Sequence, residues 1–196
     1  MIICGLDEAG RGPLAGPVVA AAVILSDSFP VDILNDSKKM TEKKRLNAEK
    51  IITAECICYA VARVDNDEID RINILQASLL AMKLAFEKMI ALADKNIDCS
   101  SVRCIADGTF CPDIIADCKA VPKADSSVFA VMAASILAKN ERDRIMYDYS
   151  KIYPAYGYER HKGYPTAEHR KICCEIGPSP IQRKSFKYAL PGTSKN

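Results

Sequence analysis

The sequence predicts an α/β fold in which helices flank a mixed sheet of five strands, with a helical segment at the C-terminus. Segments of strand length alternate with segments of helical periodicity, which is typical of α/β proteins. The first two strand segments are separated only by a short glycine-rich turn, which indicates an antiparallel start to the sheet. The five strands are expected at residues 2–8, 18–25, 56–64, 102–106 and 118–121.

The strand assignments depend on residue type and length. Residues 2–8 and 18–25 are apolar runs on either side of the turn. Residues 56–64 alternate small and apolar residues with residues that favour strands, which indicates a third strand beside them. The segments 102–106 and 118–121 are short and mostly apolar, as expected for buried strands.

Helices are indicated by capping residues and by apolar spacing. Thr41 can cap the start of a helix. Residues 73–93 carry apolar side chains at helical spacing and predict a core helix. Residues 126–149 are rich in alanine in their first half, which permits close packing on a sheet. Helices are expected at residues 41–54, 65–70, 73–93, 126–149 and 166–176, with loops at 26–36 and 154–165.

Length and composition predict one soluble globular domain over residues 1–196, whose part from about residue 150 is helical and basic. No apolar run reaches the roughly 18 residues that a membrane helix needs. The count of nine cysteines is odd, and their spacing does not match a zinc site. We therefore expect a cytoplasmic protein with reduced, mostly buried thiols and no membrane association. A monomer is expected as well.

Positive charge is concentrated at the end of the chain. Residues 160–196 contain eight Lys or Arg and two Asp or Glu, whereas the whole chain has a net charge of only +2. A basic segment beside an acidic body suits a ligand with a phosphate backbone. Arg183 and Lys184 are expected to contact phosphates. The alternative is a basic surface that only interacts with solvent.

Four acidic residues fall at the ends of expected strands or where a strand meets a helix: Asp7, Glu8, Asp107 and Asp125. Together their oxygens could bind Mg²⁺ or Mn²⁺. Two such ions about 3.5–4 Å apart can activate water and stabilise the leaving oxygen of a phosphodiester. Alternatively, Asp125 caps the helix that follows it, and the Asp-Glu pair belongs to an ordinary hairpin turn.

The two histidines, His161 and His169, give little support for covalent catalysis. Neither forms a recognisable hydrolase motif with a serine or a cysteine. We expect both to be structural, or to support the residues of the site without contacting substrate.

Motifs distributed over nearly the whole chain resemble those of the type 2 ribonucleases H, the ribonuclease HII family. The opening signature is DEAGRGPLAGPVV at 7–19. The later motifs follow in the family's order: NDSKKM at 35–40, ADG at 106–108, KADSS at 123–127, MAASILAKNERD at 132–143, HKGYPTAEH at 161–169 and RKSF at 183–186.

The resemblance implies a ribonuclease H-like fold and a metal-dependent endonuclease with Asp7, Glu8, Asp107 and Asp125 as the metal-binding acids. Such an enzyme cleaves the RNA strand of RNA–DNA hybrids. It also nicks DNA on the 5′ side of an embedded ribonucleotide, leaving 3′-hydroxyl and 5′-phosphate ends. Its partners are therefore hybrids and duplexes that contain ribonucleotides.

Family roles in substrate recognition transfer to a few positions. The backbone of Gly10, Arg11 and Gly12 would contact the 2′-hydroxyl of a ribonucleotide. Tyr164 would stack on the sugar of the next nucleotide. The resemblance also places the loop with Ser37 and Lys38 near the substrate backbone.

Two alternatives stay open on the sequence. A type 3 ribonuclease H would carry Gly-Lys-Gly in place of Gly10-Arg11-Gly12 and an N-terminal substrate-binding domain, for which the six residues before Asp7 leave no room. A hybrid-binding protein without catalysis would be favoured by loss of any of the four acids. Three positions depart from the family pattern without removing a metal ligand: Ala124, Asn140 and Gln182.

Overall fold

In the computed structural model, which describes residues 2–93, residue 97 and residues 101–187, five strands form one sheet in the order β3-β2-β1-β4-β5. The strands are β1 (Ile2–Ala9), β2 (Val18–Ile24), β3 (Cys58–Val64), β4 (Val102–Asp107) and β5 (Asp117–Val121). The helices are α1 (Glu42–Glu55), α2 (Asn66–Ile72), α3 (Ile74–Leu92), α4 (Phe129–Ile152), α5 (Tyr158–His161) and α6 (Ala167–Ile176). Short 3₁₀ turns lie at Val31–Ile33, Ala124–Ser126 and Pro154–Tyr156.

The sheet is mixed, as predicted, because β1 pairs with neighbours of both directions. On one side, β1 runs antiparallel to β2, and β2 runs antiparallel to β3. On the other side, β1 runs parallel to β4, and β4 runs parallel to β5. Leu6 lies beside Ala106 in the parallel pair, so Asp7 and Asp107 follow at the same edge of the sheet. The register of the two central strands therefore brings together acids that are 100 residues apart in sequence.

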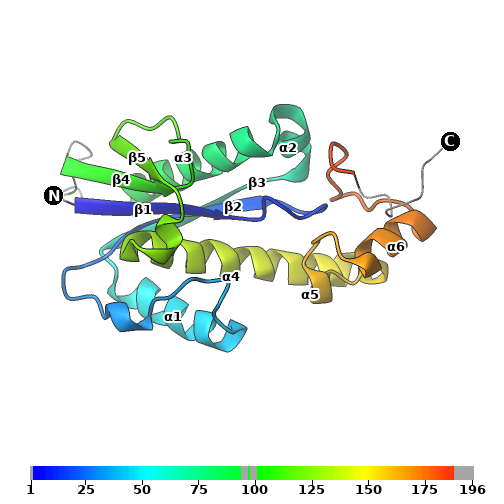
Figure 1. Ribbon diagram of the computed structural model, residues 1–196, viewed down its shortest axis with the longest axis horizontal. Helices are drawn as coiled ribbons and strands as arrows, with labels where there is room; N and C mark the ends of the chain where they lie inside the picture. Colours follow the sequence, from blue (N-terminus) through cyan, green and yellow to red (C-terminus); the bar gives the residue numbers. More distant parts are fainter. Residues whose placement is uncertain (1, 94–96, 98–100, 188–196) are drawn as a thin grey trace.

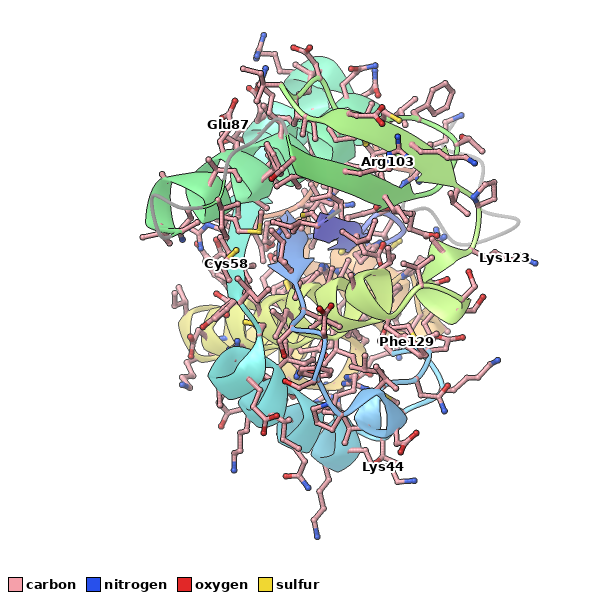
Figure 2. All side chains as sticks on the ribbon, turned by 90° about the vertical axis from the view of Figure 1, so that its left-hand side faces the viewer. Lys44, Cys58, Glu87, Arg103, Lys123 and Phe129 are labelled. Carbon is pink, nitrogen blue, oxygen red and sulfur yellow. The ribbon has the colours of Figure 1, made fainter. Side chains whose placement is uncertain are left out.

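Helices cover both faces of the sheet (Figure 1). The helix α3 packs on one face with Leu6, Ala20 and Ala22, while α4 packs on the other with Ala21 and Val23. The helix α1 lies outside α4, and Figure 2 shows the same layers from the end at which β1 begins. The alternation of side chains along β1 and β2 thus supplies two separate cores.

Gly5 explains how closely α4 approaches the sheet. A Cβ atom at this position would lie 2.1 Å from the backbone carbonyl carbon of Ala130 in α4. The alanines in the first half of α4, among them Ala133 and Ala134, are fully buried. Small residues on both sides therefore bring the beginning of α4 directly against β1.

The C-terminal segment lies at the far end of α4, next to the connection between β1 and β2 (Figure 1). Ala15, Met146, Tyr158 and Ile181 form a small buried cluster there. The Leu14 N–H donates a 2.8 Å hydrogen bond to the Gly163 carbonyl oxygen. The glycine-rich connection, residues 10–17, is therefore held between α4 and the C-terminal segment, residues 153–187.

The five-stranded fold class agrees with the sequence prediction, but the expected loop at 154–165 contains the 3₁₀ turn Pro154–Tyr156 and the one-turn helix α5. Thr41 caps α1 by accepting a hydrogen bond from the Lys44 N–H, and Thr166 caps α6 in the same way through the N–H of His169. The expected helix from residue 126 is different, because α4 begins only at Phe129. Its expected first residues form a 3₁₀ turn that follows Lys123, which has a left-handed φ of 60°.

Two compositional predictions can be compared with the described residues. No helix among them is both long enough and apolar enough to span a membrane. The eight described cysteines are free, but only Cys4, Cys104 and Cys173 are buried, so the expectation of mostly buried thiols was wrong. Cys111 and Cys174 are exposed on the surface.

Candidate active site

Three of the four predicted acids form a cluster at the carboxyl ends of β1 and β4. One carboxylate oxygen from each of Asp7, Asp107 and Asp125 lies within 4.8 Å of the others. Asp7 and Asp125 are buried, and Asp107 is half-buried. The sheet register places the first two, while the 3₁₀ turn before α4 brings in the third. In Figure 2, Lys123 marks the place where the chain passes from β5 toward this turn.

Backbone groups fix two of these carboxylates. Asp7 Oδ1 accepts a 2.7 Å hydrogen bond from the Glu8 N–H, and Asp107 Oδ1 accepts one of 2.7 Å from the Ala124 N–H. The second bond joins the end of β4 to the turn that carries Asp125. Ala124, one of the departures from the family pattern, is fully buried and keeps the N–H on which this contact depends.

Glu8 lies outside the three-carboxylate cluster. Neighbouring side chains of a strand face opposite sides of the sheet, so Glu8 follows Leu6 toward the α3 face. Its Oε1 accepts a 3.5 Å hydrogen bond from Arg11 Nη1, at the start of the glycine-rich connection. Glu8 is thus placed to join the cluster only around the end of β1.

The site concentrates negative charge in a partly dry environment. Burial raises the pKa of Asp7 well above its usual value, and the neighbouring charges of Glu8 and Asp107 raise it further. Burial also raises the pKa of Glu8, although the Arg11 guanidinium opposes this shift. Carboxylates that are costly to ionise together favour a bound cation.

The donor set fits a hard divalent cation. Carboxylate oxygens alone, without a described histidine or thiol among the clustered ligands, are the chemistry that Mg²⁺ and Mn²⁺ prefer. The nearest described cation is the ammonium of Lys38, whose Nζ lies 3.1 Å from Asp125 Oδ2. The Lys38 side chain is 76% exposed, so a metal ion can compete with it for that oxygen.

Ser37 takes a different position from the one expected. Its side chain is buried, and its hydroxyl forms a 2.8 Å hydrogen bond with the hydroxyl of Ser135 in α4. The prediction that Ser37 contacts substrate is therefore wrong for its side chain. Instead Ser37 anchors the loop that carries Lys38 to the helix behind the acids.

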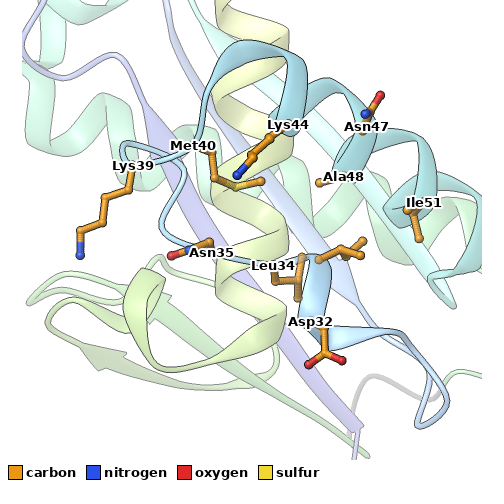
Figure 3. A pocket seen from close by; sticks show the side chains of 10 residues that line it. Asp32, Leu34, Asn35, Lys39, Met40, Lys44, Asn47, Ala48 and Ile51 are labelled. Carbon is orange, nitrogen blue, oxygen red and sulfur yellow. The ribbon is translucent and has the colours of Figure 1, made fainter.

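A hollow of about 350 Å³ lies between this loop and α1 (Figure 3). Leu34, Met40, Ala48 and Ile51 give it apolar walls. None of the four acids lines it. Lys39 points away from α1 in Figure 3. This hollow is thus separate from the carboxylate site.

The glycine-rich connection packs against Tyr164. A Cβ atom at Gly12 would lie 3.9 Å from Tyr164 Cε1, so the exposed Gly12 and the ring are neighbours. Tyr164 is 39% exposed, and Lys139 Nζ and Arg142 Cζ lie 5.6 and 5.7 Å from its ring centre. The structure therefore brings together the two elements to which substrate recognition was assigned.

The prediction that Arg183 contacts a phosphate was wrong. Its side chain is fully buried and donates hydrogen bonds to backbone carbonyl oxygens of the glycine-rich connection. These contacts use four of its five N–H groups, and the enclosed side chain presents no surface to a phosphate. Lys184, in contrast, is exposed, and its backbone N–H donates to Asp70 Oδ2 at 2.8 Å. Residues 188–196 of the basic tail lie outside the described residues.

Both histidines are buried and structural. The His161 Nδ1 accepts a hydrogen bond from the Gly163 N–H, and the His169 Nδ1 bonds to the Tyr164 carbonyl oxygen. The His169 Nε2 and the Gln182 Nε2 have no hydrogen-bond partner among the described residues. Asn140, the third departure from the family pattern, bonds within the α1–α4 interface.

Sequence reasoning missed Arg142. It occurs in the charged half of α4, where arginines normally reach solvent, yet it is fully buried and donates to three backbone carbonyls. The residues around Arg142 look the same in the sequence whether its side chain reaches solvent or is buried. Only the positions of the partner carbonyls, which come from other segments, distinguish the two cases. The family motif MAASILAKNERD at 132–143 contains Arg142, but it does not indicate that the side chain is buried.

Comparison with known proteins gives a consistent assignment. The model of the Ribonuclease HII family matches residues 4–189. Ribonuclease HII of Treponema denticola is 52% identical over 193 residues, covering 94% of this chain and 98% of that protein. The chain also resembles the crystal structure of ribonuclease H2 from Pyrococcus horikoshii OT3, with a TM-score of 0.73 and 25% identity over 96% and 95% of the two chains.

A more distant solved structure shares the fold. Bst-RNase HIII in complex with Mn²⁺ has a TM-score of 0.69 and 21% identity. The match covers 90% of this chain but 63% of that one. The type 2 family model and the type 2 relatives therefore decide between the two sister families.

Proposed function

Because the chain belongs to the ribonuclease HII family, we propose that it cleaves the RNA strand of RNA–DNA hybrids and nicks duplex DNA 5′ to an embedded ribonucleotide. The products would carry 3′-hydroxyl and 5′-phosphate ends. The cluster of Asp7, Asp107 and Asp125 carries this proposal, since its oxygens lie within 4.8 Å of one another.

The four acids would hold the divalent metal. Asp7, Asp107 and Asp125 supply the clustered oxygens, and Glu8 would join from the end of β1. Bound Mg²⁺ or Mn²⁺ would activate water and neutralise charge on the scissile phosphate, in a two-metal site. Mn²⁺ in the Bst-RNase HIII structure supports this assignment. The backbone N–H groups of Glu8 and Ala124 keep two carboxylates oriented toward the site.

Substrate recognition would use the surface beside this cluster. Gly10, Arg11 and Gly12 would present their backbone to the 2′-hydroxyl, which is the group that distinguishes RNA from DNA. The exposed face of Tyr164 would stack on the following sugar. Lys38 and Lys184, both exposed, would contact phosphates. Ser37 and Arg183 would support these groups from the interior.

The segment from about residue 150 would form the substrate-binding part of a single domain. Its basic charge and its contacts with the glycine-rich connection support this role. We further propose a monomer that works in the cytoplasm, where hybrids and ribonucleotide-containing DNA are formed.

The decisive experiment is cleavage of an end-labelled duplex with one ribonucleotide, in parallel with a continuous hybrid and an all-DNA duplex. With Mn²⁺ or Mg²⁺ we expect one cut on the 5′ side of the ribonucleotide, multiple cuts in the hybrid and none in DNA. EDTA should abolish both activities. Binding of the hybrid without cleavage in either metal would contradict the proposal.

A further inference from the structure

Two fully buried arginines, Arg142 and Arg183, lie beneath the glycine-rich connection. Neither forms an ion pair with a carboxylate in the part of the chain that the structure describes, unlike Arg45 and Arg144. Burial lowers the pKa of Arg142 to about 10 and of Arg183 to about 9, so both stay protonated at neutral pH. Burying a cation without a carboxylate partner costs free energy unless hydrogen bonds compensate for the lost water, so both guanidinium groups need acceptors inside the protein.

Backbone carbonyl oxygens are their partners. Arg183 donates to Gly10 at 2.6 Å, Pro13 at 2.9 Å, Gly16 at 2.9 Å and Arg11 at 3.1 Å. These four carbonyls all belong to the glycine-rich connection. The guanidinium therefore fixes the orientation of successive peptide planes from the inside of the molecule.

The inward carbonyls determine where the adjoining N–H groups point. In a trans peptide the N–H is directed opposite to the carbonyl, and none of the described peptides is cis. Because the Gly10 and Arg11 carbonyls face Arg183, the N–H groups of Arg11 and Gly12 face outward. Both residues are exposed, and neither N–H has a backbone partner among the described residues. Two free donors are thus presented to a ligand.

Arg142 holds two loops instead of one. It donates to the carbonyls of Pro17 at 3.1 Å and Ala15 at 3.2 Å in the connection, and to that of Lys162 at 3.1 Å. Lys162 stands two residues before Tyr164, whose ring centre lies 5.7 Å from the Arg142 guanidinium carbon. Arg142 therefore sets the ring of Tyr164 relative to the glycine-rich connection.

Glycines make room for this arrangement. A Cβ at Gly10, whose φ is 106°, would lie 2.2 Å from Arg142 Nε. A Cβ at Gly163 would lie 2.6 Å from the Ala15 carbonyl oxygen. Only residues without a side chain allow Arg142 and the two loops to meet here.

We propose that Arg142 and Arg183 are positioning residues with separable tasks in ribonucleotide recognition: Arg183 directs the Arg11 and Gly12 N–H groups outward, and Arg142 fixes Tyr164 beside them. The proposal rests on the proposed function. It predicts that Arg183 supports recognition of the ribonucleotide itself, while Arg142 supports the preference for a ribonucleotide followed by DNA.

The test compares kcat/KM of R142K and R183K on a single-ribonucleotide duplex and on a continuous hybrid. Lysine keeps the charge but replaces a planar fork of donors by one ammonium. R183K should lose about ten-fold to a hundred-fold on both substrates alike. R142K should lose about ten-fold more on the single-ribonucleotide duplex than on the hybrid. Mn²⁺ affinity, measured by calorimetry, should be unchanged in both variants.

A double variant identifies the route of the Arg142 effect. If Arg142 acts through Tyr164, R142K combined with Y164A should lose no more substrate preference than Y164A alone. Additive losses of preference, or equal losses of R142K on both substrates, would overturn the role of Arg142. A loss confined to one substrate in R183K, or normal activity on both, would overturn the role of Arg183.

Amide hydrogen exchange on the wild-type chain provides a measurement that does not depend on the variants folding. The N–H groups of Leu14 and Gly16, which have backbone partners, should be protected, whereas those of Arg11 and Gly12 should exchange quickly until hybrid is added. Protected Arg11 and Gly12 in the free protein would contradict the proposal. Wild-type protein that cleaves neither substrate would instead refute the proposed function.

Discussion

The imidazole rings of His161 and His169 stack with their centroids 4.4 Å apart and their planes 13° from parallel. Burial lowers the pKa of both rings below the ordinary value for histidine. Each ring also bonds to the backbone around Tyr164, through the Gly163 N–H and the Tyr164 carbonyl oxygen. The recognition surface is therefore coupled to two groups that the fold keeps neutral.

This stack predicts that stability depends on pH. A histidine whose pKa is lower in the folded state than in the unfolded state stabilises the fold above about pH 6.5, and this contribution is lost as the pH falls through the folded pKa. The two histidines should thus lower the Tm between about pH 7.5 and about pH 5, while the raised pKa of Asp7 contributes in the opposite direction. The decrease should be smaller in H169Q, which cannot be protonated. An equal decrease in both proteins would assign the pH dependence to other groups.

Removal of an acid from the cluster should separate activity from stability. D7N should lose at least about a hundred-fold in cleavage with Mg²⁺ or Mn²⁺, since a bound metal supplies several kcal/mol of transition-state stabilisation. Without metal its Tm should exceed that of the wild type, because the raised pKa of Asp7 shows that its ionised form is disfavoured in the fold. D113N, at an exposed carboxylate, is the matched control. Near-normal cleavage by D7N would exclude Asp7 from the site.

The neighbouring glycines should respond differently to alanine. A Cβ at Gly12 meets nothing closer than 3.9 Å, so G12A should change the free energy of unfolding by less than about 1 kcal/mol. Cleavage should nevertheless fall, because the methyl group occupies the space through which substrate approaches the backbone. G10A should lower the Tm, because its Cβ would collide with Arg142. Unchanged kcat/KM in G12A would contradict close approach at this position.

Tyr164 should determine the preference for an isolated ribonucleotide. Its hydroxyl has no hydrogen-bond partner among the described side chains, so Y164F should lose about 1 kcal/mol, or several-fold, through one bond to substrate. Y164A should lose more, and most on the single-ribonucleotide duplex, because the stacking face is removed. The control is Y59A on β3, where the side chain is 37% exposed. Equal losses of Y164A on both substrates would limit Tyr164 to supporting the fold.

The phosphate contact of the basic segment is best tested at Lys184, because Lys184 is exposed and Arg183 is buried. If Lys184 contacts a phosphate, K184Q should reduce the slope of log Kd against log salt by about one. K88Q, on α3 at the opposite face of the sheet from Asp7, should leave the slope unchanged. Charge reversal at Arg183 would not test this contact, because its buried guanidinium holds backbone carbonyls. An unchanged slope in K184Q would show that Lys184 contacts only solvent and no phosphate.

The sequence by itself determined the elements and the chemical character of the site. Apolar periodicity and the capping residue Thr41 located most of the helices, because these signals act over a few residues. The four acids could be found because each stands at the end of a strand or at a strand–helix junction. The motifs indicated the family, which the family model and the relatives confirm.

Only the tertiary structure decided which charged groups reach a ligand. Lys184 and Arg183 are adjacent cations in the sequence, yet one is exposed and the other is enclosed by carbonyls more than 160 residues away. Asp7 enters the carboxylate cluster and Glu8 faces the other side of the sheet. The reason is physical: residue type fixes charge and local pattern fixes periodicity, but desolvation depends on chain segments that meet only when the sheet, α4 and the C-terminal segment pack together.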